Sequence, residues 1–245
     1  MDVYSAGTRR HHVSALLELD VTESRMKLRE MKRAGIKGSF TGWIIKVIAD
    51  TIREYPEAAA YLASKRRMVT FDDINISTMV EKAVEGKRVP LAMVIERANE
   101  KSMGEITDEL ERARKLVVSR NEWVLGRPPG SLMALYARLP GVARRAVWNW
   151  MQRHPRLAYR QMGNVMVTSL SMLGRTHGWF IHKTVHPISF GIGAVIRKPW
   201  VTGNEITIRE ILQMTVLLDH DVIDGAPMVR FINTLAGRIE AGESI

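Results

Sequence analysis

A histidine near the carboxyl end of the chain occupies a position from which side chains often do chemistry. Residues 211–219 are rich in aliphatic and β-branched side chains, which favours a strand, and His220 follows at once. Gly225 comes five residues later and opens a segment with helical periodicity. The sequence therefore predicts His220 at a strand end, on a rigid base and facing a cleft. An imidazole there can serve as a general base, although taken alone such a histidine is more often structural.

Four other histidines give weaker signals. His182 and His186 stand four residues apart, a spacing that would place two imidazoles on one face of a helix for a metal ion. Pro187 argues against a helix and no nearby acid completes the ligand set, so we expect no metal there. His11 and His12 are adjacent in a strand-like run and should face opposite ways, which favours a surface position or a subunit contact over catalysis.

The elements that must position these residues alternate between strand-like and helical patterns. Ile44 to Ile52 carries a buried helical stripe that Pro56 ends. Ser102 and Glu105 form a capping box at the start of another helix. Strands are expected at 11–22, 74–80, 89–95, 165–170, 189–196 and 211–219, and helices at 23–34, 43–52, 102–117, 132–139, 142–153 and 228–239. This alternation predicts an α/β fold.

Length and composition point to a single globular domain spanning 1–245, since 245 residues suffice to bury a full core. There is no cysteine, which excludes disulfides, thiolate metal sites and a cysteine nucleophile. No apolar run reaches the roughly 18 residues of a membrane-spanning helix. The first ten residues lack the apolar core of a secretory signal. We therefore expect a cytoplasmic protein.

The net charge of +10 is concentrated in one segment. Between residues 117 and 163 a single acid, Glu122, faces eight arginines: Arg120, Arg127, Arg138, Arg144, Arg145, Arg153, Arg156 and Arg160. Three of the six tryptophans lie in the same stretch, which we treat as a basic insert at about 120–160. It can be a solvated helical hairpin, a binding surface for an anionic partner such as CoA phosphates or an acidic carrier domain, or a membrane-surface contact. Nucleic acid is not expected, because no nucleic-acid-binding fold surrounds the aromatic residues.

Several motifs carry a resemblance to a known family. The run DHDVIDGA (219–226) resembles the signature of the acyltransferase (E2) subunits of 2-oxo acid dehydrogenase complexes, and its shorter form is similar to that of chloramphenicol acetyltransferases. GNVMVTSLSMLG (163–174) and HPISFGIGAV (186–195) resemble the strands that precede the signature in E2 subunits. HHVSALLELDVTESR (11–25) and VPLAMVIERANEKSMGEITDEL (89–110) follow the first half of that catalytic domain in order. The resemblance covers about 200 residues and omits 120–159.

The resemblance implies a general base and an oxyanion donor. His220 matches the catalytic histidine, which takes the thiol proton of CoA or dihydrolipoamide so that the sulfur can attack an acyl thioester. Thr168 aligns best with the hydroxyl residue that stabilises the tetrahedral oxyanion. Ser169, the next residue, is the alternative donor and is otherwise expected to contact the substrate.

The remaining signature residues are implied to shape the turn around the base. Asp224 matches the motif's aspartate, which in the chloramphenicol branch pairs with an arginine before the first strand, and Arg9 is the best match for that arginine. Gly225 is expected to permit a tight strand-to-helix turn and to lie against the substrate. Asp219 is expected to orient this turn. Asp221 departs from the family, which usually has arginine there, and the reversed charge is expected to alter local pairing or partner docking.

The resemblance also implies an architecture and partners. The expected fold is that of the chloramphenicol acetyltransferases, with a mixed sheet flanked by helices, assembled as a homotrimer whose active sites lie between subunits. Acyl-CoA is the implied substrate, the acceptor is either a small molecule or a lipoyl domain acting in trans, and no metal is needed. We expect no lipoyl or peripheral-subunit-binding domain in this chain. The alternative from another class is a non-catalytic trimeric scaffold derived from an E2 subunit.

Overall fold

Strands and helices alternate along the chain in a computed structural model that describes residue 7 and residues 10–64, 67–84, 87–115, 139–169 and 177–245. The strands are β1 (His12–Asp20), β2 (Tyr61–Ser64), β3 (Arg67–Val69), β4 (Ile76–Val84), β5 (Lys87–Ile95), β6 (Val165–Ser169), β7 (Ile188–Thr202) and β8 (Glu205–Asp219). The helices are α2 (Thr22–Arg33), α3 (Phe40–Glu54), the 3-10 turn η1 (Pro56–Ala59), α4 (Met103–Lys115), α6 (Gly141–Gln152), α7 (Pro155–Met162) and α8 (Gly225–Ala241).

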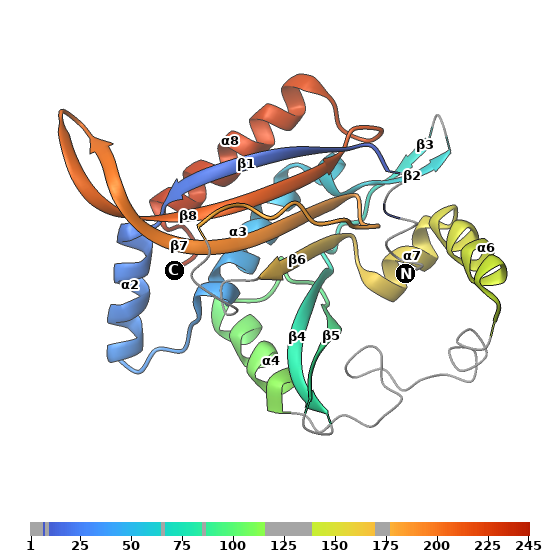
Figure 1. Ribbon diagram of the computed structural model, residues 1–245, viewed down its shortest axis with the longest axis horizontal. Helices are drawn as coiled ribbons and strands as arrows, with labels where there is room; N and C mark the ends of the chain where they lie inside the picture. The colour runs from blue at the N-terminus through green and yellow to red at the C-terminus, as the bar shows by residue number, and fades with distance from the viewer. Residues whose placement is uncertain (1–6, 8–9, 65–66, 85–86, 116–138, 170–176) are drawn as a thin grey trace.

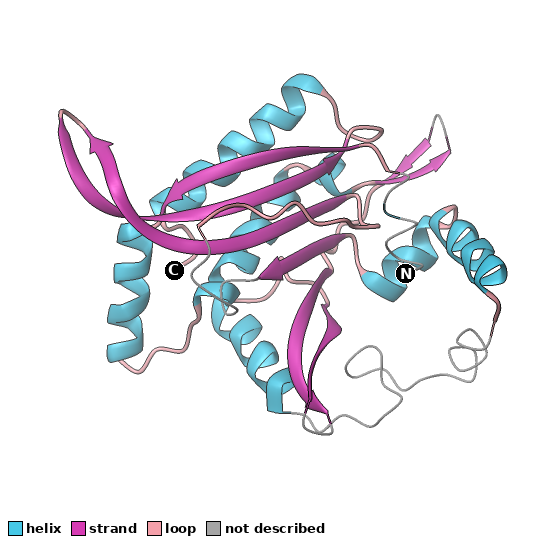
Figure 2. Cartoon of the chain, in the orientation of Figure 1, coloured by secondary structure: helices cyan, strands magenta, loops and turns pink. Residues whose placement is uncertain are grey.

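A six-stranded mixed sheet forms the centre of the molecule, with strand order β1, β8, β7, β6, β4 and β5 (Figure 1). Strand β6 runs parallel to its neighbours β4 and β7, and the other pairs are antiparallel. Helices flank this sheet, as Figure 2 shows. The expected α/β class, with a mixed sheet and flanking helices, is confirmed.

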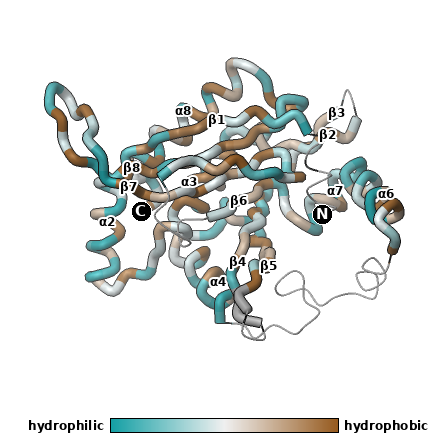
Figure 3. The backbone as a smooth tube through the Cα atoms, viewed as in Figure 1, coloured by the Kyte–Doolittle hydropathy of each residue, from teal (hydrophilic) through white to brown (hydrophobic). Residues whose placement is uncertain are grey.

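The hydrophobic core lies between the sheet and helices α3 and α8. Alternate residues of β7 and β8 point into it, among them Phe190 and Val216, which have no exposed surface. Trp43 and Ile48 of α3 and Phe231 of α8 meet them from the other side and are equally buried. The brown, hydrophobic stretches of β7, β8 and α3 in Figure 3 mark this layer. Burial on this scale fixes the strands that carry the candidate site.

Local side-chain caps define where two of the core helices begin. The hydroxyl of Ser39 accepts a hydrogen bond from the backbone N–H of Gly42, 3.1 Å away, at the start of α3. At the start of α4 the carboxylate of Glu105 accepts from the backbone N–H of Ser102 at 2.8 Å, and Glu105 N–H donates back to the Ser102 hydroxyl. This reciprocal pair is the capping box expected from the sequence.

The face of the sheet opposite the helices is crossed by residues 177–187, which we call the strap. The backbone N–H of Gly178 donates to Gln213 Oε1 on β8 at 2.7 Å, and the Trp179 indole donates to the Leu17 carbonyl on β1 at 2.8 Å. Phe180 lies so close to β7 that a Cβ on Gly191 would stand 3.0 Å from its ring. Gly191 therefore lets the strap lie directly on the sheet.

Three features of the described residues differ from the sequence expectations. The β2–β3 hairpin and helix α7 were not predicted, and β7 and β8 continue into a long two-stranded ribbon around the turn at Gly203. The ribbon reaches beyond the helices, so its residues lack the buried alternation that marks a half-buried strand. The helix expected at 132–139 lies outside the described residues. Among those that are described, no helix has the length and hydropathy needed to cross a membrane.

Candidate active site

His220 lies immediately after β8, as the sequence predicted. Its backbone N–H donates to the carbonyl of His11 at 3.0 Å, which ties the turn to the chain just before β1. The imidazole Nε2 stands 3.2 Å from Oδ1 of Asp224, and 48% of the His220 side chain is exposed. A half-exposed imidazole on a strand end, with a carboxylate beside it, can accept a proton and have the resulting charge stabilised.

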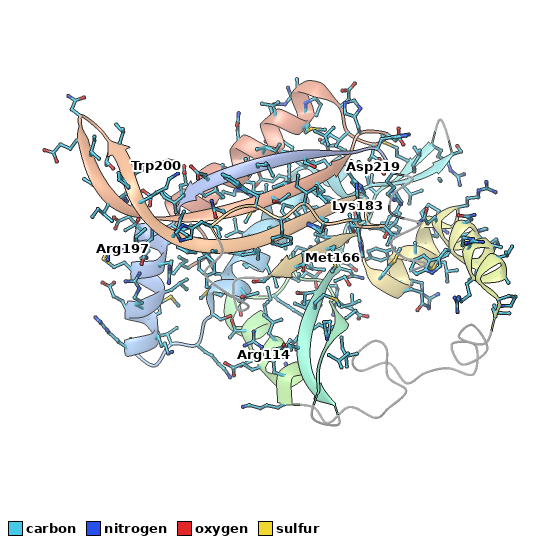
Figure 4. The ribbon with its side chains drawn as sticks, viewed as in Figure 1. Arg114, Met166, Lys183, Arg197, Trp200 and Asp219 are labelled. Atoms are coloured by element: carbon cyan, nitrogen blue, oxygen red, sulfur yellow. The ribbon has the colours of Figure 1, made fainter. Side chains whose placement is uncertain are left out.

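The turn that carries His220 is organised by Asp219. The Asp219 carbonyl accepts hydrogen bonds from the backbone N–H groups of Val222, at 3.0 Å, and Ile223, at 3.1 Å. Its carboxylate is 2.5 Å from the guanidinium of Arg10, and both side chains are largely buried. Arg10 thus pairs with Asp219 of this turn, whereas the expected pairing of Arg9 with Asp224 involves a residue that lies outside the described ones. Figure 4 labels Asp219 at this end of β8.

The other signature residues lie on the exposed side of the same turn. Asp224 is mostly exposed and contacts His220. Gly225 begins α8 with a φ of +40°, a backbone conformation that side-chain-bearing residues rarely adopt. Asp221, at the position where the family usually has arginine, faces His11 with 3.0 Å between its carboxylate and Nδ1. The carboxylate at this position thus contacts a histidine that lies just before β1.

Thr168 and Ser169 occupy opposite faces of β6. Val165 and Val167 are buried in the core, so the alternation of a strand places Ser169 on the helix-covered side and Thr168 on the strap side. Thr168 pairs with Gly191, the residue on which the strap lies. Both hydroxyl residues are partly buried. Thr168 is the one that shares a sheet face with the strap.

Within one protomer His220 and Thr168 are far apart. Thr168 on β6 is in register with Gly191 of β7, whereas His220 lies two residues beyond Leu218 of β8, which is in register with Ile188. The offset is two interstrand spacings, roughly 10 Å, and about five residues along the strands, roughly 16 Å. The two groups cannot act on one substrate bond from the same chain.

Three histidines meet where the strap crosses the sheet: His182 and His186 belong to the strap, and His12 begins β1. His186 is buried and the other two are partly buried. His182 Nε2 contacts the hydroxyl of Ser189 on β7, and His186 Nε2 donates to the Met162 carbonyl at 2.9 Å. His12 in turn donates from Nε2 to the His186 carbonyl at 3.0 Å. Burial lowers the pKa of His182 and of His186 to about 4, so both rings are neutral near pH 7.

These histidines serve as hydrogen-bonding anchors for the strap. Each ring has at least one partner in the strap, the sheet or α7. No group of three or more metal-ligating side chains gathers anywhere in the described ranges. The four-residue spacing of His182 and His186 could not reveal these roles, because their partners, the Ser189 hydroxyl and the Met162 carbonyl, are brought to the rings by the way the strap lies on the sheet.

Comparison with known sequences identifies the family. The model of the 2-oxoacid dehydrogenases acyltransferase (catalytic domain) matches residues 5–121 and 151–245. The acetyltransferase component of the Bacillus subtilis pyruvate dehydrogenase complex is 24% identical over 232 residues, which is 91% of this chain and 43% of that protein. The corresponding Haemophilus influenzae component is 26% identical over 231 residues, covering 91% and 34%. The chain thus spans less than half the length of these relatives.

Solved structures of similar proteins share the fold. The cubic core of a pyruvate dehydrogenase multienzyme complex superposes with a TM-score of 0.66 at 19% identity, covering 98% of this chain and 85% of that one. Azotobacter vinelandii dihydrolipoamide acetyltransferase gives 0.68 at 19% identity with the same coverage. A chloramphenicol acetyltransferase gives 0.57 at 14% identity, covering 98% and 92%. The fold and the family match together establish that the chain belongs to the catalytic domains of the 2-oxoacid dehydrogenase acyltransferases.

Proposed function

We propose that this domain transfers an acyl group between CoA and a thiol, with dihydrolipoamide presented in trans or a small molecule as the acceptor. The observation that carries the proposal is His220, which stands half-exposed at the end of a buried strand with Asp224 3.2 Å from its Nε2. The order of signature residues around it, Asp219, His220, Asp224 and Gly225, follows that of the family to which the chain belongs.

The reaction needs only proton transfer and nucleophilic attack. The neutral imidazole of His220 accepts the proton of the acceptor thiol, and the thiolate adds to the carbonyl carbon of the acyl-CoA thioester. The Thr168 hydroxyl donates a hydrogen bond to the oxyanion that forms, while the Asp224 carboxylate stabilises the imidazolium. Collapse breaks the bond to the CoA sulfur, and the imidazolium returns its proton to the departing thiolate. No oxidant, metal or covalent acyl-enzyme enters the balance.

The roles of the two groups have support beyond this chain's geometry. The Azotobacter vinelandii relative was studied for the parts that one serine, one histidine and one asparagine play in its catalytic mechanism. Its serine and histidine are 52 positions apart, as are Thr168 and His220, and its histidine and asparagine are four apart, as are His220 and Asp224. This spacing favours Thr168 over Ser169 as the oxyanion donor.

The separation of the two groups within a protomer leads to a proposed oligomer. Since His220 and Thr168 are too far apart in one chain, the complete site requires His220 of one protomer and Thr168 of its neighbour. A closed ring of three identical head-to-tail contacts satisfies this requirement at every site. The cubic core formed by a relative indicates that such units can be built into larger assemblies.

The direct test is to incubate the purified protein with a panel of acyl-CoAs and either free dihydrolipoamide or a lipoyl domain, and to quantify released CoA by chromatography. We expect turnover that falls by at least about 10²-fold in His220→Ala, because a general base contributes on that scale. His177→Ala, which removes an exposed histidine of the strap, is the matched control and should retain activity. Silence with every donor and acceptor would instead favour the non-catalytic scaffold.

A further inference from the structure

Helix α6 presents an apolar face to solvent. Val142, Ala146, Val147 and Trp150 are exposed and, at 3.6 residues per turn, lie within roughly 140° of the helix circumference. The exposed fractions are 71% for Val142 and 54% for Trp150, and α6 has no fully buried residue. An amphipathic helix normally turns this face toward the core. Here it points away from the domain.

The surroundings of that face carry only one sign of charge. Residues 141–162 contain five arginines and neither aspartate nor glutamate. Arg145 on α6, Arg153 just after its last residue, and Arg156 and Arg160 at the start and end of α7 are exposed. A protein partner of ordinary composition would offer few carboxylates to Arg145, Arg153 and Arg156. A layer of phosphates over an apolar phase matches both the charge and the exposed hydrophobic side chains.

Helix α6 also lies mostly outside the part of the chain that the family model matches. The family model matches up to residue 121 and resumes at 151, so almost all of α6 falls in the unmatched interval. Helix α7, by contrast, is anchored to the domain: Tyr159 stacks on Phe71 with 3.9 Å between ring centroids and donates to the Asp73 carbonyl at 3.1 Å. A fixed α7 therefore holds α6 at the periphery of the molecule, at the end opposite the β7–β8 ribbon (Figure 1).

We propose that α6 docks the domain on the surface of an anionic phospholipid membrane. Trp150 with Val142 and Val147 enters the boundary between headgroups and acyl chains, and the arginines of α6 and α7 bind the lipid phosphates. The contact lies in the interface plane and does not involve crossing of the bilayer. It is independent of acyl transfer, because no residue of α6 belongs to the candidate active site.

The test is flotation of the full-length protein with phosphatidylcholine vesicles and with vesicles that also contain phosphatidylglycerol. We expect binding to the anionic vesicles only, weakened by added salt. Arg145→Ala with Arg153→Ala should lower the partition coefficient about fivefold per arginine. Trp150→Ala with Val147→Ser should lower it comparably, whereas Val201→Ser with Ile206→Ser, which removes exposed apolar side chains of the ribbon, should not.

The two α6 variants act through different side chains, so a folding defect in one, detected by circular dichroism, leaves the other as the deciding measurement. Equal binding to neutral vesicles, no binding to anionic vesicles at low salt, or binding unaffected by both variants would overturn the proposal. So would a concentration-dependent oligomer that is lost in the α6 variants, because a second copy would then cover the face. CoA release should stay unchanged in all these variants, which separates this test from that of the proposed function.

Discussion

The chemistry assigned to His220 depends on how few groups surround it. The ring has the Asp224 carboxylate at 3.2 Å and solvent on its exposed side, and its backbone is fixed by the His11 carbonyl. A thiol that approaches from the solvent side would therefore meet an imidazole whose position is set but whose proton can exchange. The signature predicted this residue because a strand end is the place where rigidity and access coincide.

At the residue scale, exchange of the two neighbouring hydroxyl residues distinguishes their roles. Thr168→Val should lower kcat by about 10²–10³ with little change in KM, because the hydroxyl acts on the oxyanion and not on the bound substrate. Ser169→Ala should have a much smaller effect, since Ser169 is on the helix-covered side of β6. Steady-state kinetics of both variants decide between them. A large loss of kcat in Ser169→Ala with an active Thr168→Val would reverse the assignment.

Buried histidines predict how stability responds to acid. Burial holds the pKa of His182 and His186 at about 4, below the value of 6.5 of an unfolded histidine. Between these values the unfolded chain binds more protons than the folded one, so the free energy of unfolding is greatest above about pH 6.5 and falls as the pH drops toward 4. His186→Gln, whose amide can still donate to the Met162 carbonyl, should show a shallower loss. Denaturant titrations at pH 7 and pH 5 measure the difference; equal slopes for both proteins would refute it.

At the scale of elements, the turn between β8 and α8 depends on one buried ion pair. Arg10 and Asp219 have side chains that are 11% and 3% exposed. Arg10→Ala leaves the buried carboxylate without its partner, which should cost about 3–5 kcal/mol of stability and lower activity as the His220 turn shifts. Arg97→Ala, which breaks an exposed pair with Glu100, should cost less than about 1 kcal/mol. Chemical denaturation of both variants measures the two changes in the free energy of unfolding. Similar changes would show that the buried Arg10–Asp219 pair stabilises the fold no more than an exposed pair does.

Sequence patterns anticipated the elements with a regular apolar periodicity, including α6, whose apolar face is exposed, and missed those fixed by partners distant in the chain. Helix α3 could be predicted from its buried apolar stripe, and the start of α4 could be predicted from its capping box. Helix α7 was not predicted, because its anchor is Tyr159 stacking on Phe71, a partner that no local pattern encodes. The strap was not predicted for the same reason, because its hydrogen bonds to Gln213 and to the Leu17 carbonyl join segments far apart in the chain. In the candidate site, the signature located His220, but only strand register showed how far Thr168 lies from it.

At the scale of the whole molecule, the register of the strands that carry His220 and Thr168 determines whether one chain can form the proposed site alone. The offset between β6 and β8 keeps His220 and Thr168 apart in each protomer, so the proposed activity needs neighbouring chains. The basic helix α6 lies at the periphery, at the end of the molecule opposite the β7–β8 ribbon, and contributes no residue to the candidate site (Figure 1). The proposed catalysis and the proposed surface docking therefore use different residues, and variants that remove one should spare the other.

Complementation between two inactive variants tests most directly whether each active site takes His220 and Thr168 from different chains. His220→Ala and Thr168→Val are unfolded together, refolded as an equimolar mixture and assayed for CoA release, with different affinity tags to demonstrate mixed oligomers. If each site takes its histidine and its hydroxyl from different chains, random assembly restores both groups in about one quarter of the sites, and activity should recover to about that fraction of wild type. Mixed oligomers that remain as inactive as either variant alone would contradict the shared site.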